Sequence, residues 1–367
     1  MGNIEYLIPL IIATVVLFSN LFVEDGKEKL LFEIAVIFFS ITLLTLMISL
    51  KGNVEPDYIT YKILFDSGPS LFELNSDTFS YARTVINGIE PGLIVFNSIV
   101  KVFGGTYQHA ITIVAVTSSI SIIYIASYFP ENRRSIVLLV LMFLFFQGLF
   151  IQTRFALSCL LSYVAVIGYL NKRYCLALLL LLLAFSFHII AVFSLVVILV
   201  WRFRDVIYRN IFILFLLLIP LTLFDPTAIL KTIIETVMPR YVYYLNFYDG
   251  ASTSPFPFYW RLCFNLMMLL SFYYCDRDVL NNASSLEKLL LIMCLINVAS
   301  WSIGYNFPIL YRVSWFFDFG YIFYPLVLYK MKKWPIRLIL TGLFMIFLYF
   351  RVVNGLDSYQ PYYFDFV

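Results

Sequence analysis

The sequence has little charge and few groups that bind metals. Only 13% of its 367 residues are Asp, Glu, Lys or Arg, against roughly 25% in an ordinary soluble domain. It has two histidines, and its five cysteines stand singly without a Cys-x-x-Cys pair, so neither a zinc site nor a redox dithiol is expected. The net charge of +3 is small and scattered. We therefore expect no nucleic acid partner, no metal and no other cofactor.

Nucleotide-binding features are missing as well. The sequence has no Gly-x-x-x-x-Gly-Lys-Ser/Thr loop and no acidic cluster suited to a nucleotide-bound metal. Apolar residues are abundant instead, since 62% of the chain is hydrophobic and 19% is aromatic. A water-soluble protein of this size could not bury so much apolar surface, so a membrane protein is predicted.

Long uncharged runs reach or approach the ~20 residues with which a helix crosses a bilayer. The clearest cover residues 135–151, 155–171, 174–201 and 289–311. They lack the alternating polarity of a membrane β-barrel strand. We predict an all-α, polytopic integral membrane protein with about 10–13 transmembrane or re-entrant helices. It is expected to form a single transmembrane domain over residues 1–367, with extracytoplasmic loops at about 51–90 and 226–255.

Lys and Arg collect in one set of connections between the apolar segments, which marks those connections as cytoplasmic. They include Arg133 and Arg134, Lys172 and Arg173, the segment 202–209 and the segment 330–337. Both polar stretches, and the helix ends near Arg154 and Arg312, are then expected at the opposite face. The first apolar segment, 4–23, has no basic residues before it and is expected to be a retained helix.

This orientation predicts two irregularities. Segment 91–103 is too short to span a bilayer. Segment 174–201 must return to the side from which it started, which a break near Phe187 and His188 would allow. Non-helical backbone at membrane depth is tolerated where it is buried in protein or lines a wet cavity, so a cavity at His188 is expected. A single tilted helix with a polar kink is the alternative.

Three arginines are candidates for binding a diphosphate, because Arg stays charged and offers planar, bidentate donors to phosphate oxygens. Arg154 follows Gln152 between two apolar runs, where a guanidinium is costly unless it meets an anion or water; a helix-end interface residue is its alternative role. Arg312 lies six positions before Asp318, so Asp318 is not its i,i+4 partner. Arg240 lies in the second polar stretch, where a solvated Arg is the alternative.

Other polar residues are candidates for binding a sugar substrate or for acting on it as a base. His188 or Asp57 could act as the catalytic base, and the sequence does not choose between them; a buried structural histidine is the alternative for His188. Tyr58, Tyr61, Glu90 and Gln152 are candidate sugar-binding residues. For Glu90 the alternative is a carboxylate that stabilises the start of a helix.

Taken in order, these pieces resemble the Wzy/EpsG-like family of bacterial polysaccharide polymerases. The resemblance lies in Asp57-Tyr58-x-x-Tyr61-x-x-x-Phe65, Glu90-x-Gly92, Arg154 followed by Ala156, His188 after an apolar half-helix, and Arg312 with Phe316-Phe317. These motifs extend over most of the chain.

The resemblance implies a multi-pass protein of the bacterial plasma membrane, with a GT-C-like fold and an active site facing the periplasm or exterior. It implies a nucleotide- and metal-independent glycosyltransferase that joins oligosaccharide repeat units carried on undecaprenyl diphosphate. Its expected partners are that lipid-linked oligosaccharide, membrane lipids and a chain-length regulator. A flippase or exporter of lipid-linked oligosaccharide and an O-antigen-type ligase are the alternatives.

Overall fold

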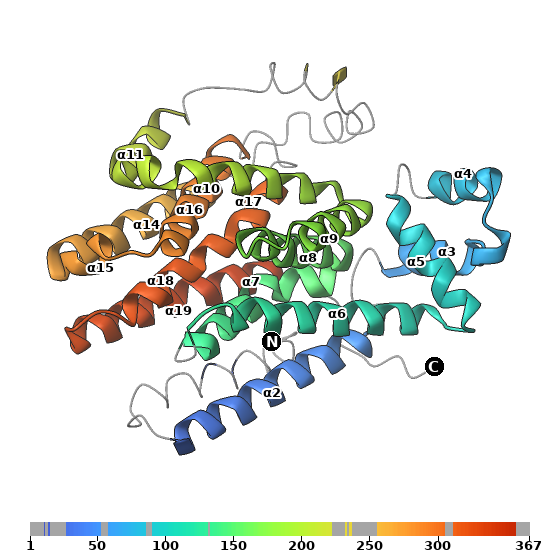
Figure 1. Ribbon diagram of the computed structural model, residues 1–367, viewed down its shortest axis with the longest axis horizontal. Helices are drawn as coiled ribbons and strands as arrows, with labels where there is room; N and C mark the ends of the chain where they lie inside the picture. Colours follow the sequence, from blue (N-terminus) through green and yellow to red (C-terminus); the bar gives the residue numbers. More distant parts are fainter. Residues whose placement is uncertain are drawn as a thin grey trace. The chain divides into compact units, whose positions relative to one another are not determined.

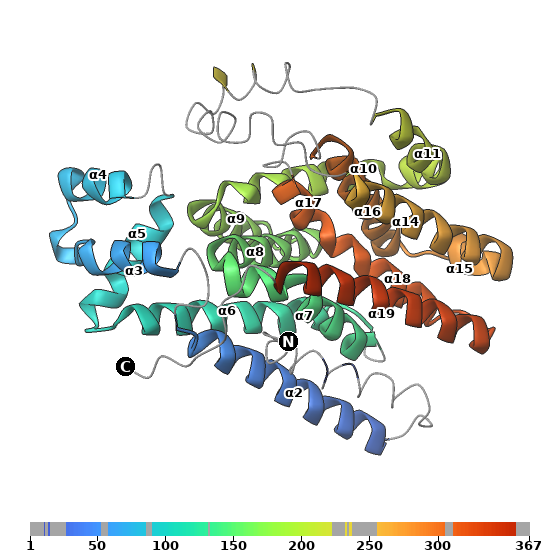
Figure 2. The ribbon, with the colours of Figure 1, turned by 180° about the vertical axis from the view of Figure 1, so that it is seen from behind.

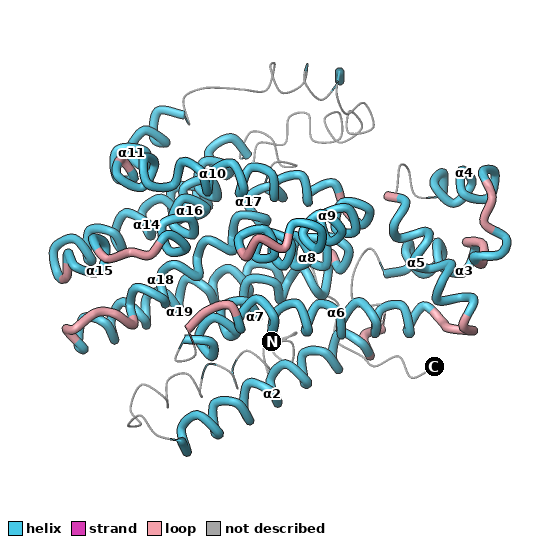
Figure 3. Tube along the Cα trace, viewed as in Figure 1, coloured by secondary structure: helices cyan, strands magenta, loops and turns pink. Residues whose placement is uncertain are grey.

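The computed structural model describes residues 27–52, 58–85, 90–130, 133–221, 255–304 and 311–356, with a few isolated positions elsewhere. These residues are helical nearly throughout, joined by short connections (Figures 1 and 3). The predicted all-α, polytopic membrane fold is confirmed. The chain divides into two compact units, unit 1 with residues 1–194 and 346–367 and unit 2 with residues 195–345. A single transmembrane domain over the whole chain stays a prediction.

Unit 1 contains most of the predicted site residues. Its described elements, in chain order, are α2 (Lys27–Ser49), α3 (Tyr58–Ser67), the short 3-10 helix η2 (Leu71–Glu73), α4 (Ser76–Val85), α5 (Pro91–Val102), α6 (Tyr107–Ser127), α7 (Arg134–Ile151), α8 (Thr153–Leu170), α9 (Tyr174–Phe187) and the 3-10 helix η4 (Ile189–Val192). Helices α8 and α9 pack side by side along their lengths, α6 packs against α8, and α2 packs against α6 (Figure 1).

Unit 2 is a second group of helices. Figure 2 shows the same ribbon as Figure 1 from behind. Its elements are α10 (Phe193–Arg209), which begins in unit 1, α11 (Ile211–Leu221), α14 (Phe256–Cys275), α15 (Arg277–Asn281), α16 (Ser285–Gly304), α17 (Tyr311–Phe317), the 3-10 helix η7 (Asp318–Ile322), α18 (Phe323–Leu328) and α19 (Trp334–Leu356), which ends in unit 1. Helix α16 packs against α11, α14, α17, η7 and α18.

Four of the described helices are long and apolar enough to cross a membrane. They cover Tyr107–Ser127, Thr153–Leu170, Ser285–Ile303 and Trp334–Val352. Each overlaps an apolar segment of the sequence and has the length and mean hydropathy with which a helix can cross a bilayer. Shorter apolar helices accompany them, among them Pro91–Val102 and Tyr174–Phe187.

The first polar stretch, expected as a loop over 51–90, contains helices α3, η2 and α4. Between α3 and α4 the carboxylate of Glu73 accepts hydrogen bonds from the backbone N–H and the hydroxyl of Ser70, each at 2.9 Å. These bonds lower the pKa of the Glu73 carboxyl from its usual value, the backbone bond most. The second stretch, 226–255, lies outside the described residues apart from single positions.

The break in segment 174–201 is confirmed. Helix α9 ends at Phe187, the backbone at His188 is extended (φ −160°, ψ 136°), and η4 and α10 follow. The alternative of one continuous tilted helix is therefore wrong. The short helix expected at 91–103 is also present as α5, with Pro91 at its first position, where a missing N–H costs nothing.

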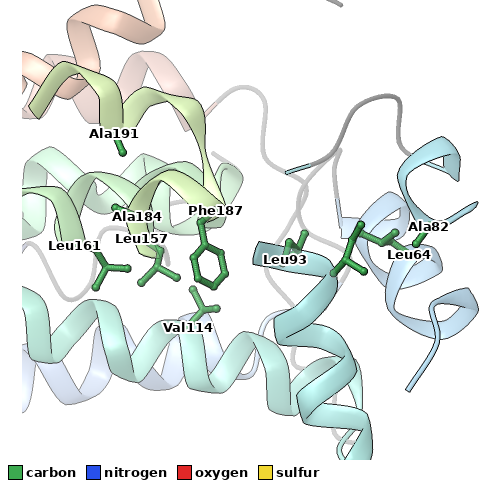
Figure 4. Packing of buried hydrophobic residues seen from close by; sticks show 10 residues of the cluster. Leu64, Ala82, Leu93, Val114, Leu157, Leu161, Ala184, Phe187 and Ala191 are labelled. Carbon is green, nitrogen blue, oxygen red and sulfur yellow. The ribbon is translucent and has the colours of Figure 1, made fainter. Parts of the chain in front are cut away.

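The break lies against a buried apolar cluster of unit 1. Figure 4 shows Phe187, at the end of α9, next to Leu157 of α8 and Val114 of α6, with Leu93 of α5 beyond it. Helix α5 comes so close to α9 that a Cβ placed on Gly92 would lie 2.6 Å from the carbonyl oxygen of Ser186. Glycine at position 92 thus sets the distance between these two helices.

Candidate functional site

Arg154 lies at a break between two helices. The N–H of Gln152 donates to the carbonyl of Gly148 at 2.9 Å and closes α7, while the carbonyl of Gln152 accepts from the N–H of Ala156 at 2.9 Å and opens α8. The backbone at Gln152 is non-helical (φ −128°, ψ 58°). The chain therefore bends at Gln152, and Arg154 occupies the first turn of α8.

Three of the predicted site residues meet at this turn. The Arg154 Nε donates a hydrogen bond to the hydroxyl of Tyr61 at 2.9 Å, and its Nη1 donates to the carboxylate of Glu90, with which it forms an ion pair. The guanidinium carbon also lies 5.1 Å from the centroid of the Tyr61 ring. Tyr61 comes from α3 and Glu90 is the residue before α5, so three separate segments converge on one guanidinium.

The ion pair is largely shielded from water, since the side chains of Arg154 and Glu90 are 19% and 11% exposed. Charges in such a position are stable only when they are paired and hydrogen-bonded. The Arg154 side chain is therefore held inside unit 1 by Tyr61 and Glu90. Glu90, predicted to bind sugar, is placed to hold the arginine as well.

A cavity adjoins Arg154. It is small and partly open, with about 40 Å³ accessible to the centre of a water molecule. Its lining is mostly apolar and comes from α3, α5, α6, α8 and α9: Tyr61, Leu93, Phe96, Asn97, Tyr107, Ala110, Ile111, Val114, Thr153, Arg154, Leu157 and Phe187. The cavity expected at the break in segment 174–201 is thus lined by Phe187, the neighbour of His188, and not by His188 itself.

His188 takes part in the local structure of the break. Its Nδ1 accepts a hydrogen bond from the backbone N–H of Ile190 at 3.1 Å and so caps η4. A nitrogen that accepts carries no proton, so the neutral ring has its proton on Nε2. The ring packs edge to face on Phe155 at 5.5 Å, and the Ser158 hydroxyl lies 3.2 Å from the His188 carbonyl oxygen. These contacts place His188 beside the first turns of α8. Phe155 and Ser158, which it contacts there, follow Arg154 within four positions.

Three further candidates have other surroundings or lie outside the described residues. Tyr58 is buried, its ring packs edge to face on Tyr107 at 5.3 Å, and its hydroxyl lies 3.5 Å from the side-chain oxygen of Gln108. It therefore faces α6, one turn away from Tyr61. Asp57 lies outside the described residues, as does Arg240 in the second polar stretch. Their roles stay predictions.

Arg312 belongs to unit 2, where it is half-buried in α17. A network of buried polar groups holds this helix. The amide nitrogen of Asn297, on α16, donates to the carbonyl of Ser314 at 2.7 Å and to the carboxylate of Asp318 at 2.8 Å. Both acceptors follow Arg312 within two turns, so Asn297 fixes the segment that carries this arginine.

Sequence reasoning missed the cation in this network. Arg261, on α14, forms an ion pair with Asp318 at 3.4 Å and lies 3.3 Å from the hydroxyl of Tyr321. Its guanidinium carbon also lies 4.8 Å from the centroid of the Trp301 ring. The signal was present, because an arginine inside an apolar helix is costly without a partner. Arg261 was not singled out because it is the single charged residue in the apolar stretch 256–275.

No cluster of three or more His, Cys, Asp or Glu suited to a metal is found in the part of the chain that the structure describes. The chemistry visible in unit 1 is instead that of a fixed guanidinium beside an apolar cavity. An arginine in such a position can donate hydrogen bonds to carboxylate or phosphate oxygens.

The fold and this arginine site define a polytopic membrane protein with a paired guanidinium beside a mostly apolar cavity. Comparison with protein families gives the family directly: the model of the EpsG family matches residues 34–364, most of the chain. The protein belongs to the EpsG family, and the resemblance seen in its motifs is confirmed. Membership implies a function of the exopolysaccharide polymerase type. Searches of curated proteins and of solved structures give no match, so the GT-C-like fold stays a prediction.

Proposed function

We propose that this protein is a polysaccharide polymerase of the bacterial plasma membrane. It joins oligosaccharide repeat units carried on undecaprenyl diphosphate, at the outer face of that membrane, without a nucleotide or a metal. Membership of the EpsG family supports the reaction class. The observation that carries the substrate class is the Arg154 guanidinium, held by Tyr61 and Glu90 at the wall of a mostly apolar cavity.

In the proposed reaction the growing chain is the donor. A hydroxyl at the non-reducing end of a new lipid-linked unit attacks the anomeric carbon that joins the growing chain to its diphosphate. The new glycosidic bond forms, the bond from that carbon to the diphosphate oxygen breaks, and undecaprenyl diphosphate leaves with the electron pair. The hydroxyl proton passes to a base. Arg154 and Arg312, with Arg240 as a third candidate, stabilise the negative charge that grows on the leaving group.

The geometry of Arg154 supports a role in binding the leaving group. Arginine has five N–H donors in a rigid fork. The hydrogen bonds to Tyr61 and Glu90 come from Nε and Nη1, and they hold the fork in one orientation before the substrate arrives. A donor fixed in advance needs little reorganisation as charge develops, which is how electrostatic stabilisation lowers a barrier.

The base is His188 or Asp57, and the hydrogen bonding of His188 favours Asp57. Since Nδ1 of His188 already accepts the Ile190 N–H, the ring could take a proton only after releasing the cap of η4 or moving its own proton from Nε2.

A genetic experiment tests the arginines. In a strain that lacks its polymerase, Arg154→Ala and Arg312→Ala should abolish polymer while the amount of protein in the membrane stays unchanged. Arg83→Ala is the matched control, because Arg83 is an exposed arginine on α4, and it should give polymer of normal length. Normal polymer from both site variants would refute the proposal.

A reconstitution experiment separates the reaction from its alternatives. Purified protein in vesicles is given lipid-linked repeat units at the face where its site opens, with no membrane potential and no ion gradient. Chain growth supports the polymerase. Translocation of the units without elongation would mean a flippase, and transfer of a finished chain to a different acceptor without elongation would mean a ligase. Either of these results would overturn the proposal.

A further inference from the structure

A buried lysine lies at the break between α7 and α8. Lys51, just after α2, has a relative exposure of 0%. Its Nζ donates to the carbonyl of Phe150, in the last turn of α7, at 2.8 Å and to the hydroxyl of Thr153, the first residue of α8, at 3.3 Å. One ammonium group therefore joins the two sides of the break immediately before Arg154.

The break supplies what a buried ammonium group needs. Carbonyls in the last turn of a helix lack partners within the helix, and a cation is stabilised near that end. An ammonium ion is costly to bury unless it is well bonded, so these acceptors dictate where it lies. Because Lys51 is fully buried, its ammonium must stay bonded to these acceptors. The position of Lys51 and the geometry of the break therefore depend on each other.

Lys51 is itself anchored to a different helix. The side-chain nitrogen of Gln108, on α6, donates to the carbonyl of Ser49 and to the carbonyl of Lys51, the latter at 3.3 Å. The backbone that carries the ammonium is thus fixed by α6, while the ammonium acts on α7 and α8. Lys51 therefore connects α6 to the start of α8 through hydrogen bonds to Gln108 and Thr153.

We propose that Lys51 is a positioning residue for Arg154. Its ammonium sets the bend between Phe150 and Thr153 and thereby aims the Arg154 guanidinium at Tyr61, Glu90 and the cavity. Thr153 and Arg154 both line that cavity, so a change in the bend moves cavity wall and guanidinium together. This inference rests on the proposed function, in which Arg154 binds the diphosphate.

Two substitutions separate the charge of Lys51 from its bulk. Lys51→Met keeps an unbranched side chain but removes the ammonium, and Lys51→Arg restores a cation that can donate to both acceptors. Lys101→Met is the matched control, because the Lys101 Nζ also donates to carbonyls at a helix end, those of Asp66 at 3.1 Å and of Gly68 after α3. That lysine has no part in the α7–α8 break.

The experiment uses the full-length protein in lipid nanodiscs. Affinity for undecaprenyl diphosphate, the kinetics of chain elongation and the thermal unfolding midpoint are measured for each variant. Lys51→Met should weaken undecaprenyl diphosphate binding and lower kcat/KM by about tenfold or more, since small displacements of a binding group have effects of that size. Lys51→Arg should recover most of the affinity for undecaprenyl diphosphate and most of kcat/KM. Lys101→Met should leave the affinity and kcat/KM unchanged, whatever it does to the unfolding midpoint.

A double variant shows whether Lys51 acts through Arg154. In the Arg154→Ala background, adding Lys51→Met should weaken undecaprenyl diphosphate binding no further, because the group that Lys51 positions is gone. An equal additional loss in that background would mean that Lys51 contacts the ligand itself, and would overturn a positioning role. Should Lys51→Met not be recovered folded, Lys51→Gln, which keeps a polar side chain but removes the ammonium charge, takes its place in both backgrounds: weaker binding that disappears in the Arg154→Ala background supports the proposal, and unchanged binding overturns it.

The two proposals fail in different ways. Normal affinity and kinetics in Lys51→Met, together with an inactive Arg154→Ala, would overturn the positioning role and leave the polymerase in place. Normal binding and elongation in Arg154→Ala would overturn the role of the arginine in the proposed function, whatever the Lys51 variants do.

Discussion

The guanidinium of Arg154 is paired with the carboxylate of Glu90, which lies 64 positions earlier in the chain. The pair joins the first turn of α8 to the start of α5, and Tyr61 of α3 completes it. A guanidinium held on two sides has a defined direction, which a flexible arginine at a helix end would lack. The pairing therefore fixes the position of the Arg154 guanidinium within unit 1.

The first prediction concerns the charge of Glu90. Glu90→Gln keeps a hydrogen-bond acceptor but removes the negative charge, so Arg154 is held less firmly and a partly buried cation loses its partner. We expect a loss of about 1–3 kcal/mol in the free energy of unfolding, below the value for a fully buried pair because both side chains are partly exposed. Polymer formation should fall but persist, in contrast to Arg154→Ala.

A double-mutant cycle tests the coupling. Unfolding of Glu90→Gln, Arg154→Gln and the double variant is measured in the same detergent. If the two residues act as a pair, the loss in the double variant is smaller than the sum of the single losses. Additive losses would contradict the pairing.

The second prediction concerns the close approach of α5 and α9. A Cβ at position 92 would lie 2.6 Å from backbone atoms of Ser186, which cannot move aside as a flexible side chain would. Gly92→Ala should therefore push α5 from α9, displace Glu90 and lower the free energy of unfolding by about 1–3 kcal/mol. Gly342→Ala is the control, since a Cβ there meets nothing within 4 Å. A Gly92→Ala protein as stable and active as the wild type would rule out the tight contact.

The spanning helices and the break at His188 could be predicted from the sequence because they follow from one-dimensional properties. Uncharged length predicts a span, and the positions of Lys and Arg predict on which side a segment ends. The two rules together required the segment 174–201 to return to its starting side, which predicted a break within it. The helices of the first polar stretch escaped this reasoning, because α3 and α4 are partly polar and a hydropathy pattern does not distinguish them from a loop.

The candidate site was predictable in its residues but not in its contacts. Arg154, Glu90 and Tyr61 were each recognised as unusual polar groups, yet nothing in their spacing says that they touch. Asp318 was correctly excluded as an i,i+4 partner of Arg312, but its ion-pair partner, Arg261, lies 57 positions away on another helix. Such pairs depend on packing, which periodicity does not encode.

The third prediction separates the two candidate bases. Asn can accept a backbone N–H at the start of a helix as His188 Nδ1 does for η4, so His188→Asn should keep polymer formation near the wild-type level. His188→Ala removes the cap and should cost about 1 kcal/mol of stability. Asp57→Asn should abolish polymer without loss of protein from the membrane. Absence of polymer in His188→Asn, with normal membrane levels, would instead assign the base to His188.

The last prediction concerns the buried ion pair of unit 2. The side chains of Arg261 and Asp318 are 9% and 1% exposed, so Asp318→Asn leaves a cation without its carboxylate and should lower the free energy of unfolding by about 3–5 kcal/mol. Adding Arg261→Met should recover much of this loss, because no unpaired charge then remains. Asp205→Asn is the control: Asp205 pairs with Lys288 but is 57% exposed, and its loss should cost under about 1 kcal/mol. Equal effects of Asp318→Asn and Asp205→Asn on thermal unfolding would show that the buried pair does not hold the segment carrying Arg312.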